Sequence, residues 1–193
     1  MRVLVTGADR PLGRDVARHL ARDHEVRLCG LSQSTTGLDR YWQVDLRAAE
    51  AIVPLVTRTD AIVHVAEFEP LPRPDLDLLE HASLGTYRLL SAAREAGVSR
   101  IVLVSRLSFF DAYPERYLID ELWRPWPSTE APELAPFLAE MVTREFAHEG
   151  SICAVCLRFS PIGSDPERNT TLADALEAID RALTLEFTVP GHR

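Results

Sequence analysis

Residues 3–13 read VLVTGADRPLG, and this stretch decides the fold. An apolar, β-branched run leads into Gly7, and an amphipathic stretch begins at Pro11. A strand that feeds a glycine-containing turn and then a helix is typical of dinucleotide sites, because glycine permits the tight turn and the amides at the helix start face the pyrophosphate. The stretch therefore predicts a phosphate loop with these contact residues: Gly7, Arg10, Leu12 and Gly13.

Beyond this loop, β-branched apolar runs alternate with amphipathic helical patterns along the chain. Such alternation is typical of βαβ units and a parallel sheet. The expected strands are Arg2–Thr6, Glu25–Cys29, Tyr41–Val44, Ala61–Val65, Arg100–Ser105, Ile152–Phe159 and Leu185–Val189. The expected helices are Pro11–Arg22, Ala48–Thr57, Leu76–Ala96, Glu133–His148 and Leu172–Leu183. We predict one α/β domain over residues 1–193, a three-layer, doubly wound parallel sheet of six or seven strands.

The composition narrows the classes of partner. A net charge of −8 argues against nucleic acid or an anionic membrane surface, since both require a clustered positive field. No run of eighteen apolar residues occurs and the Met1 start lacks a signal-peptide pattern, so we expect a cytoplasmic protein. All 21 basic residues are Arg, which excludes every mechanism that needs a lysine ammonium group.

The three cysteines are too few for a disulfide framework. Cys153 and Cys156 have the spacing of a metal or redox motif, but they lie in a strand-like run. Positions three apart on a strand point to opposite faces of the sheet. We therefore interpret both as small core residues and predict no metal site.

Several ordered segments carry a family resemblance. Thr-Gly-Ala, followed by a Gly six residues after Gly7, is how phosphate loops of short-chain dehydrogenases/reductases are written. Further matching segments are Asp45-Leu46, His64-Val65-Ala66, Leu84-Gly85-Thr86 and residues 93–98, 102–105, 157–159 and 173–175. The chain resembles the NAD-dependent epimerase/dehydratase branch of that superfamily, which implies a Rossmann fold. Extended relatives append a substrate lobe after the sixth strand, and we expect that lobe to be absent or vestigial here.

The resemblance also implies a cofactor site. It places Asp45 and Leu46 at the adenine, and Val65 and Ala66 near the central ribose. The family's middle loop glycine is replaced, so that Arg10 either crowds the pyrophosphate or reaches out to a phosphate. The second predicted strand ends without a carboxylate for a ribose 2′-hydroxyl, which favours NADP over NAD if a dinucleotide binds.

The catalytic residues that the resemblance implies are missing. Counted along the chain, the family's general-acid Tyr falls on Phe137 and its Lys on Met141. The family's Ser falls near Leu107, with Ser105 and Ser108 on either side, and its Asn falls on Ala82. We predict the loss of redox catalysis by the family's mechanism, with apolar side chains walling the crevice.

Three functions remain open at this stage. The chain could be a silent nucleotide-binding relative that acts as a regulator or subunit. It could instead be a biosynthetic isomerase, cyclase or dehydratase that uses titratable residues on the crevice side, for which the candidates are His64, Glu67, His81 and Asp111. The family label alone would suggest an NADP-dependent sugar-nucleotide enzyme.

An isologous homodimer is expected from the helical faces and the resemblance. In such relatives the helices after the fourth and fifth strands pair across a two-fold axis. The helix over Leu76–Ala96 has a second apolar face, which includes Leu78 and Leu89. We expect charges at those two positions to give a folded monomer.

Overall fold

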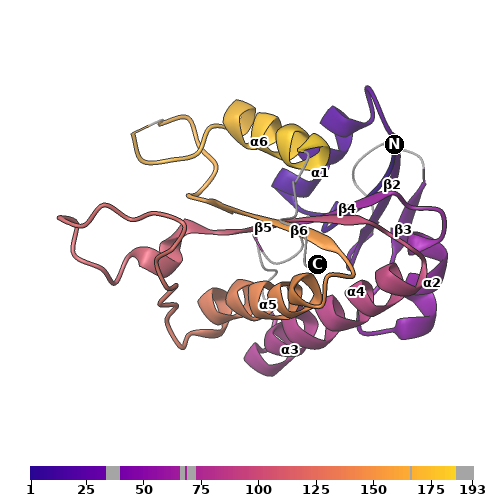
Figure 1. Cartoon of the computed structure of the whole chain (residues 1–193), viewed down its shortest axis with the longest axis horizontal. Coiled ribbons are helices and arrows are strands. Elements are labelled where there is room, and N and C mark those ends of the chain that lie inside the picture. Colours follow the sequence, from indigo (N-terminus) through magenta and orange to yellow (C-terminus); the bar gives the residue numbers. More distant parts are fainter. Residues whose placement is uncertain (34–39, 66–67, 69–72, 166, 186–193) are drawn as a thin grey trace, which may run out of the picture.

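The computed structural model describes residues 1–33, 40–65, 68, 73–165 and 167–185. Its centre is one parallel sheet with the strand order β3-β2-β1-β4-β5-β6 (Figure 1). The strands are β1 (Arg2–Thr6), β2 (Glu25–Gly30), β3 (Tyr41–Gln43), β4 (Ala61–His64), β5 (Arg100–Arg106) and β6 (Cys153–Phe159). The order reverses between β1 and β4, so a crevice is expected at their carboxyl ends, next to the phosphate loop.

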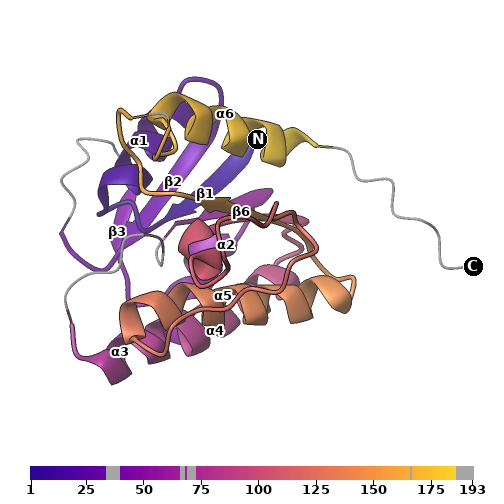
Figure 2. The same ribbon diagram turned by 90° about the vertical axis from the view of Figure 1, so that its left-hand side faces the viewer.

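Helices cover both faces of the sheet, as Figures 1 and 2 show. On one face lie α1 (Pro11–Leu20) and α6 (Leu172–Thr184). On the other lie α2 (Ala49–Val56), α3 (Asp75–Glu80), α4 (Thr86–Glu95) and α5 (Ala131–His148). Two apolar cores result, one between the sheet and α1/α6 and one between the sheet and α2/α4/α5. The predicted three-layer, doubly wound fold is confirmed.

The predicted elements agree with the observed ones, with boundaries shifted by one or two residues at most ends. The predicted helix Leu76–Ala96 is α3 and α4 joined by a π-helical turn over His81–Gly85. The predicted strand Leu185–Val189 begins at the residue that follows α6, and its remainder lies outside the described residues. Among the described residues, no helix is both long and apolar enough to cross a membrane.

Small residues form part of the inward face of α5. The apolar residues Leu138 and Val142 are only half-buried, whereas Phe146 is buried. Ala131 and Ala135 are also buried, because α5 packs closely against α3 and the π-helical turn there.

The dimer face predicted from the sequence is also wrong. Leu78 and Leu89 are 4% and 0% exposed, because they belong to the apolar layers between α3/α4, α5 and the sheet. Charges at these two positions would remove core contacts and bury a charge, so they would unfold the domain instead of separating a dimer. The exposed apolar residues of this helix pair are others, among them Leu76 and Tyr87.

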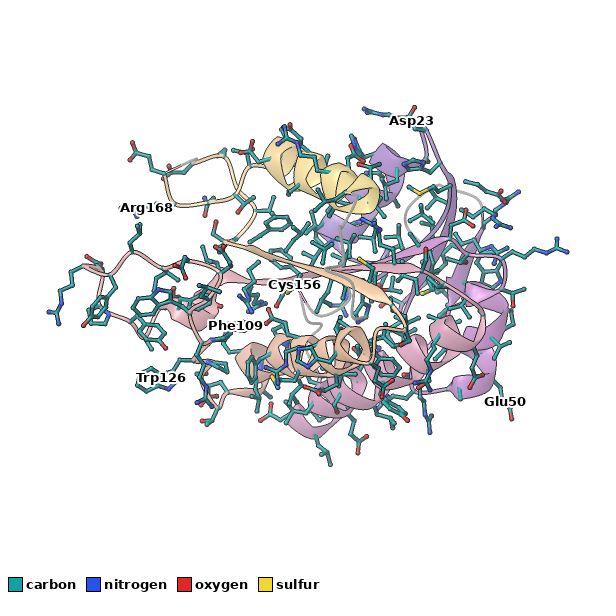
Figure 3. The ribbon with its side chains drawn as sticks, in the orientation of Figure 1. Asp23, Glu50, Phe109, Trp126, Cys156 and Arg168 are labelled. Atoms are coloured by element: carbon teal, nitrogen blue, oxygen red, sulfur yellow. The ribbon has the colours of Figure 1, made fainter. Side chains whose placement is uncertain are left out.

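The two strand cysteines are not core residues either. Cys156 is exposed and Cys153 is half-buried, because β6 is the last described strand of the sheet and no helix covers this end of its face completely. Figure 3 shows Cys156 between β6 and α5. No cluster of three or more potential metal ligands occurs within the described part of the chain.

Candidate functional site

The loop between β1 and α1 has the backbone of a phosphate loop. Gly7 takes a positive φ of 70°, and the Arg10 amide donates a hydrogen bond to the Gly7 carbonyl at 2.9 Å. A Cβ on Gly13 would lie 2.1 Å from that carbonyl oxygen, so only glycine fits where α1 packs on the loop. Both glycines therefore have the local role that the sequence suggested.

The side chains of this loop turn toward β2. The Asp9 side chain is 2% exposed and the Arg10 side chain 5%, with Arg10 Nε 3.6 Å from Asp9 Oδ1. A cavity of only about 10 Å³ remains between the loop, the end of β2 and His81. Arg10 lies inside this space, next to the carboxylate that attracts it.

The predicted adenine-edge residue Asp45 is engaged elsewhere. Its carboxylate accepts hydrogen bonds from Arg47 Nε at 3.1 Å and Nη2 at 2.6 Å, and the same guanidinium also binds Asp77. These hydrogen bonds lower the pKa of Asp45 to about 2. Leu46 and Val65 are buried at 2% and 0% exposure, and Ala66 lies outside the described residues.

A charged cluster occupies the crevice at the carboxyl ends of β4, β5 and β6. Arg106 Nη1 donates to Glu133 Oε1 at 2.6 Å, and the Ser108 hydroxyl donates to Glu133 Oε2 at 2.7 Å. Arg106 Nε donates to the Phe68 carbonyl at 2.9 Å. These residues line a cavity of about 290 Å³, together with Phe159, Pro161 and Ile162. We name Arg106, Ser108 and Glu133 the crevice cluster.

Phe137 and Met141 lie in a different place from the one expected. They line a cavity of about 590 Å³ between α5 and the β5–β6 end of the sheet, which Cys156 and Arg158 also line. The Phe137 ring packs edge-on against Phe109, 5.8 Å between centroids (Figure 3 labels Phe109 beside α5). The α5 residue that does line the crevice cavity is Glu133, so an ion pair stands there in place of the expected apolar wall.

The absence of the family's Tyr and Lys from α5 does not depend on which α5 residues align with those two positions. The 18 residues of α5 include neither amino acid, and the chain contains no Lys at all. Near the other expected positions, Leu107 is exposed, Ser105 is buried and Ala82 is buried in the π-helical turn. Ser108 alone of this group joins the crevice cluster.

The remaining titratable candidates do not converge on the crevice. The His64 ring is fully buried and hydrogen-bonded on both sides, to Thr6 Oγ1 at 2.6 Å and Thr86 Oγ1 at 3.1 Å. His81 is buried beside the phosphate loop, and Asp111 lines a separate cavity together with Cys156 and Arg158. Glu67 lies outside the described residues.

Sequence reasoning missed Glu133 and Arg106 as site residues. The sequence contained a signal for both, since Arg106 directly follows the predicted strand Arg100–Ser105 and Glu133 opens the predicted helix Glu133–His148. Parallel strands place the residues that follow them at one sheet edge, where ligand sites form.

A family model independently matches residues 3–191, and its description is the NAD-dependent epimerase/dehydratase family. The chain belongs to this family. A uronate dehydrogenase of Agrobacterium fabrum is 35% identical over 117 residues, which are 59% of this chain and 44% of that protein. The chain thus spans less than half the length of this curated relative.

Solved structures of family relatives have the same fold. The uronate dehydrogenase of Agrobacterium tumefaciens is 25% identical with a TM-score of 0.85, covering 96% of this chain and 73% of that one. A short-chain dehydrogenase/reductase superfamily protein from Agrobacterium tumefaciens, solved with bound NAD, is 28% identical with a TM-score of 0.73. The match covers 85% of this chain and 50% of that one.

The backbone of the loop between β1 and α1 fits a bound dinucleotide, but the arrangement of the loop's side chains does not. The Gly7–Gly13 contact keeps side chains away from the turn, as close approach of a pyrophosphate requires. One buried carboxylate oxygen, Asp9 Oδ1, accepts no hydrogen bond within the described residues. The space beside it is filled by Arg10, which must move before a nucleotide can enter.

The Asp45–Arg47 pair predicts a pH-dependent contribution to stability. The pKa of Asp45 is lowered in the folded state, so the pair stabilises the fold above the carboxyl's ordinary pKa, 3.8, and this contribution is lost as the pH falls toward about 2. Asp45→Asn should cost about 1 kcal/mol at pH 7, because the partly exposed pair is screened by solvent. Urea unfolding at pH 7, 4 and 2.5 measures this difference. Glu177→Gln, which removes an exposed carboxylate of α6, is the control; a deficit independent of pH would contradict the assignment.

Proposed function

We propose that residues 1–193 form one dinucleotide-binding domain of the NAD-dependent epimerase/dehydratase family that does not catalyse hydride transfer by the family's Tyr–Lys mechanism. It would act by binding, as a regulator or subunit. The observation that carries this proposal is the crevice itself. Glu133 and Arg106 are paired there, and α5 holds neither Tyr nor Lys.

The binding half of the proposal rests on the phosphate loop. Gly7 and Gly13 would hold the pyrophosphate against the loop backbone and the start of α1, with Leu12 at that helix start. Leu46, which lines the small cavity beside the loop, would supply an apolar contact for the adenosine half. A nicotinamide dinucleotide supplies hydride chemistry when bound, and no Tyr–Lys pair is present in α5 to handle the accompanying proton.

The crevice cluster favours a second candidate function, a non-redox enzyme such as an isomerase, cyclase or dehydratase. Glu133 is a carboxylate at the edge of a cavity, held by Ser108 and Arg106 and about one-third exposed. A carboxylate positioned in this way can accept a proton from a bound substrate. The relatives named uronate dehydrogenases suggest a sugar acid, whose hydrogen next to the carboxyl group is the most acidic one bound to carbon.

The first proposal predicts no redox turnover. Glucuronate, galacturonate and UDP-glucuronate should each give no change in absorbance at the nicotinamide band with either NAD or NADP. The double variant Phe137→Tyr/Met141→Lys should be equally inactive, because those side chains line the cavity beside β6 and not the crevice. Reduction of a dinucleotide that scales with protein concentration would refute the proposal.

The second candidate predicts proton exchange without redox change. In deuterated water, glucuronate should gain deuterium at the carbon next to its carboxyl group, as measured by NMR. Glu133→Gln should lower the exchange rate at least about 100-fold, which is the usual scale of general-base catalysis. Glu130→Gln, an exposed position just before α5, is the matched control. Exchange that survives Glu133→Gln would rule out this role.

We also propose a homodimer, formed by a face other than the one the sequence indicated. α4 and α5 pack side by side, and Tyr87 contacts Phe146 with 5.7 Å between ring centroids. Tyr87 is 53% exposed, and Leu138 and Val142 of α5 are half-buried, so apolar area faces outward on both helices. An isologous contact would cover this area.

Tyr87→Glu combined with Leu138→Glu should convert the dimer to a folded monomer, because both side chains lie at the outer face and not in the core. Sedimentation at micromolar concentration measures the association state, and circular dichroism checks the fold. Leu118→Glu, at a 91% exposed position between β5 and α5, should leave the dimer intact. A monomeric unmutated protein would contradict this proposal.

A further inference from the structure

The Asp9 carboxylate crosses from the phosphate loop to the end of β2. Its Oδ2 accepts hydrogen bonds from the Leu31 amide at 3.2 Å and the Ser32 amide at 3.0 Å. The loop is tied to the same strand by the Ala8 amide, which donates to the Cys29 carbonyl at 3.0 Å. β2 is the neighbour of β1 along the whole length of β1 (Figure 2), so the position of this carboxylate is fixed by backbone on both sides.

The second oxygen, Oδ1, has no hydrogen-bond donor among the described residues although it is buried. It lies 3.6 Å from Arg10 Nε, and a Cβ on Gly30 would come within 2.3 Å of it. The absence of a side chain at Gly30 is therefore what leaves room for the carboxylate. Buried acceptors without a donor are rare in folded proteins because the lost hydration is not replaced.

In dinucleotide folds the adenosine ribose is held by a carboxylate about 20 residues after the phosphate loop, at the end of the second strand. β2 ends here in Cys29 and Gly30, which carry none. The Asp9 carboxylate reaches the same strand end from the loop side. We propose that Asp9 Oδ1 is the acceptor for a ribose hydroxyl of the bound dinucleotide, and that Asp9 thereby selects NAD over NADP.

The charge at this position determines the direction of the selectivity. A ribose 2′-phosphate placed at Asp9 would meet a carboxylate, and the Leu31 and Ser32 amides that could bind it already bind Asp9. The structure thus favours the opposite cofactor from the NADP that β2 and Arg10 suggested in the sequence.

Arg10 has a separate effect on affinity. Its side chain occupies the space between the loop and β2, of which only about 10 Å³ is left. Arg10→Ala should therefore strengthen the binding of both dinucleotides. The Arg10→Ala variant also allows binding to be measured if the unmutated protein binds dinucleotides too weakly for titration.

The test is calorimetric titration of NAD and NADP, without any turnover, against the unmutated protein, Asp9→Asn, Arg10→Ala and the double variant. NAD should bind more tightly than NADP, and Asp9→Asn should shift the affinity ratio toward NADP by about tenfold or more, in either Arg10 background. Asp15→Asn removes the same charge from α1, where Asp15 pairs with exposed Arg18 at 3.5 Å, and should leave the ratio unchanged.

This inference rests on the proposed dinucleotide-binding function, and the titrations separate the two. No heat of binding for either dinucleotide with any variant, Arg10→Ala included, would overturn both. Binding with a ratio that Asp9→Asn leaves unchanged, or with NADP preferred by the unmutated protein, would overturn the role of Asp9 alone.

Discussion

The contact between Gly13 and the Gly7 carbonyl oxygen is the constraint on which the site depends. A Cβ at Gly13 would lie 2.1 Å from that oxygen, so α1 can approach the turn only because both positions lack side chains. This approach places the start of α1 directly at the carboxyl end of β1. Two residues between the glycines carry charged side chains, Asp9 and Arg10, and both lie beside the end of β2 and His81. The glycine contact thereby determines which side chains enter the nucleotide space.

Pairs of carboxylate and guanidinium recur at the positions where a ligand of this fold would bind. Asp9 and Arg10 pair beside the end of β2, Asp45 and Arg47 pair just before α2, and Arg106 binds Glu133 in the crevice. Because every basic residue is Arg, each cation presents several donors in one plane and can hold a carboxylate through more than one hydrogen bond. A ligand must compete with these internal pairs, so binding at this site involves exchange of partners and not simple filling of an open pocket.

The fold could be read almost completely from the sequence, and the site only in part. The apolar runs at Arg2–Thr6 and Arg100–Arg106 are local patterns, and the strands they form lie at nearly the predicted bounds. Gly7 and Gly13 were predictable for the same reason, since a tight turn has local requirements. The buried face of α5 is harder to read from the sequence, because small residues such as Ala135 pack against the neighbouring helices, and the periodicity of large apolar residues does not identify them.

The sequence by itself determined the order of strands and helices, the phosphate loop, and the absence of a Tyr–Lys pair from a chain with no Lys. These are properties of residue identity and short-range spacing. Only the tertiary structure decided that Arg10 turns inward, that Asp9 reaches β2, and that Glu133 rather than Phe137 lines the crevice. Each of these outcomes depends on which segments the parallel sheet brings together at its carboxyl edge. Charge pairs at that edge form between residues that are close in space. The spacing of these residues along the chain does not indicate that they will be close.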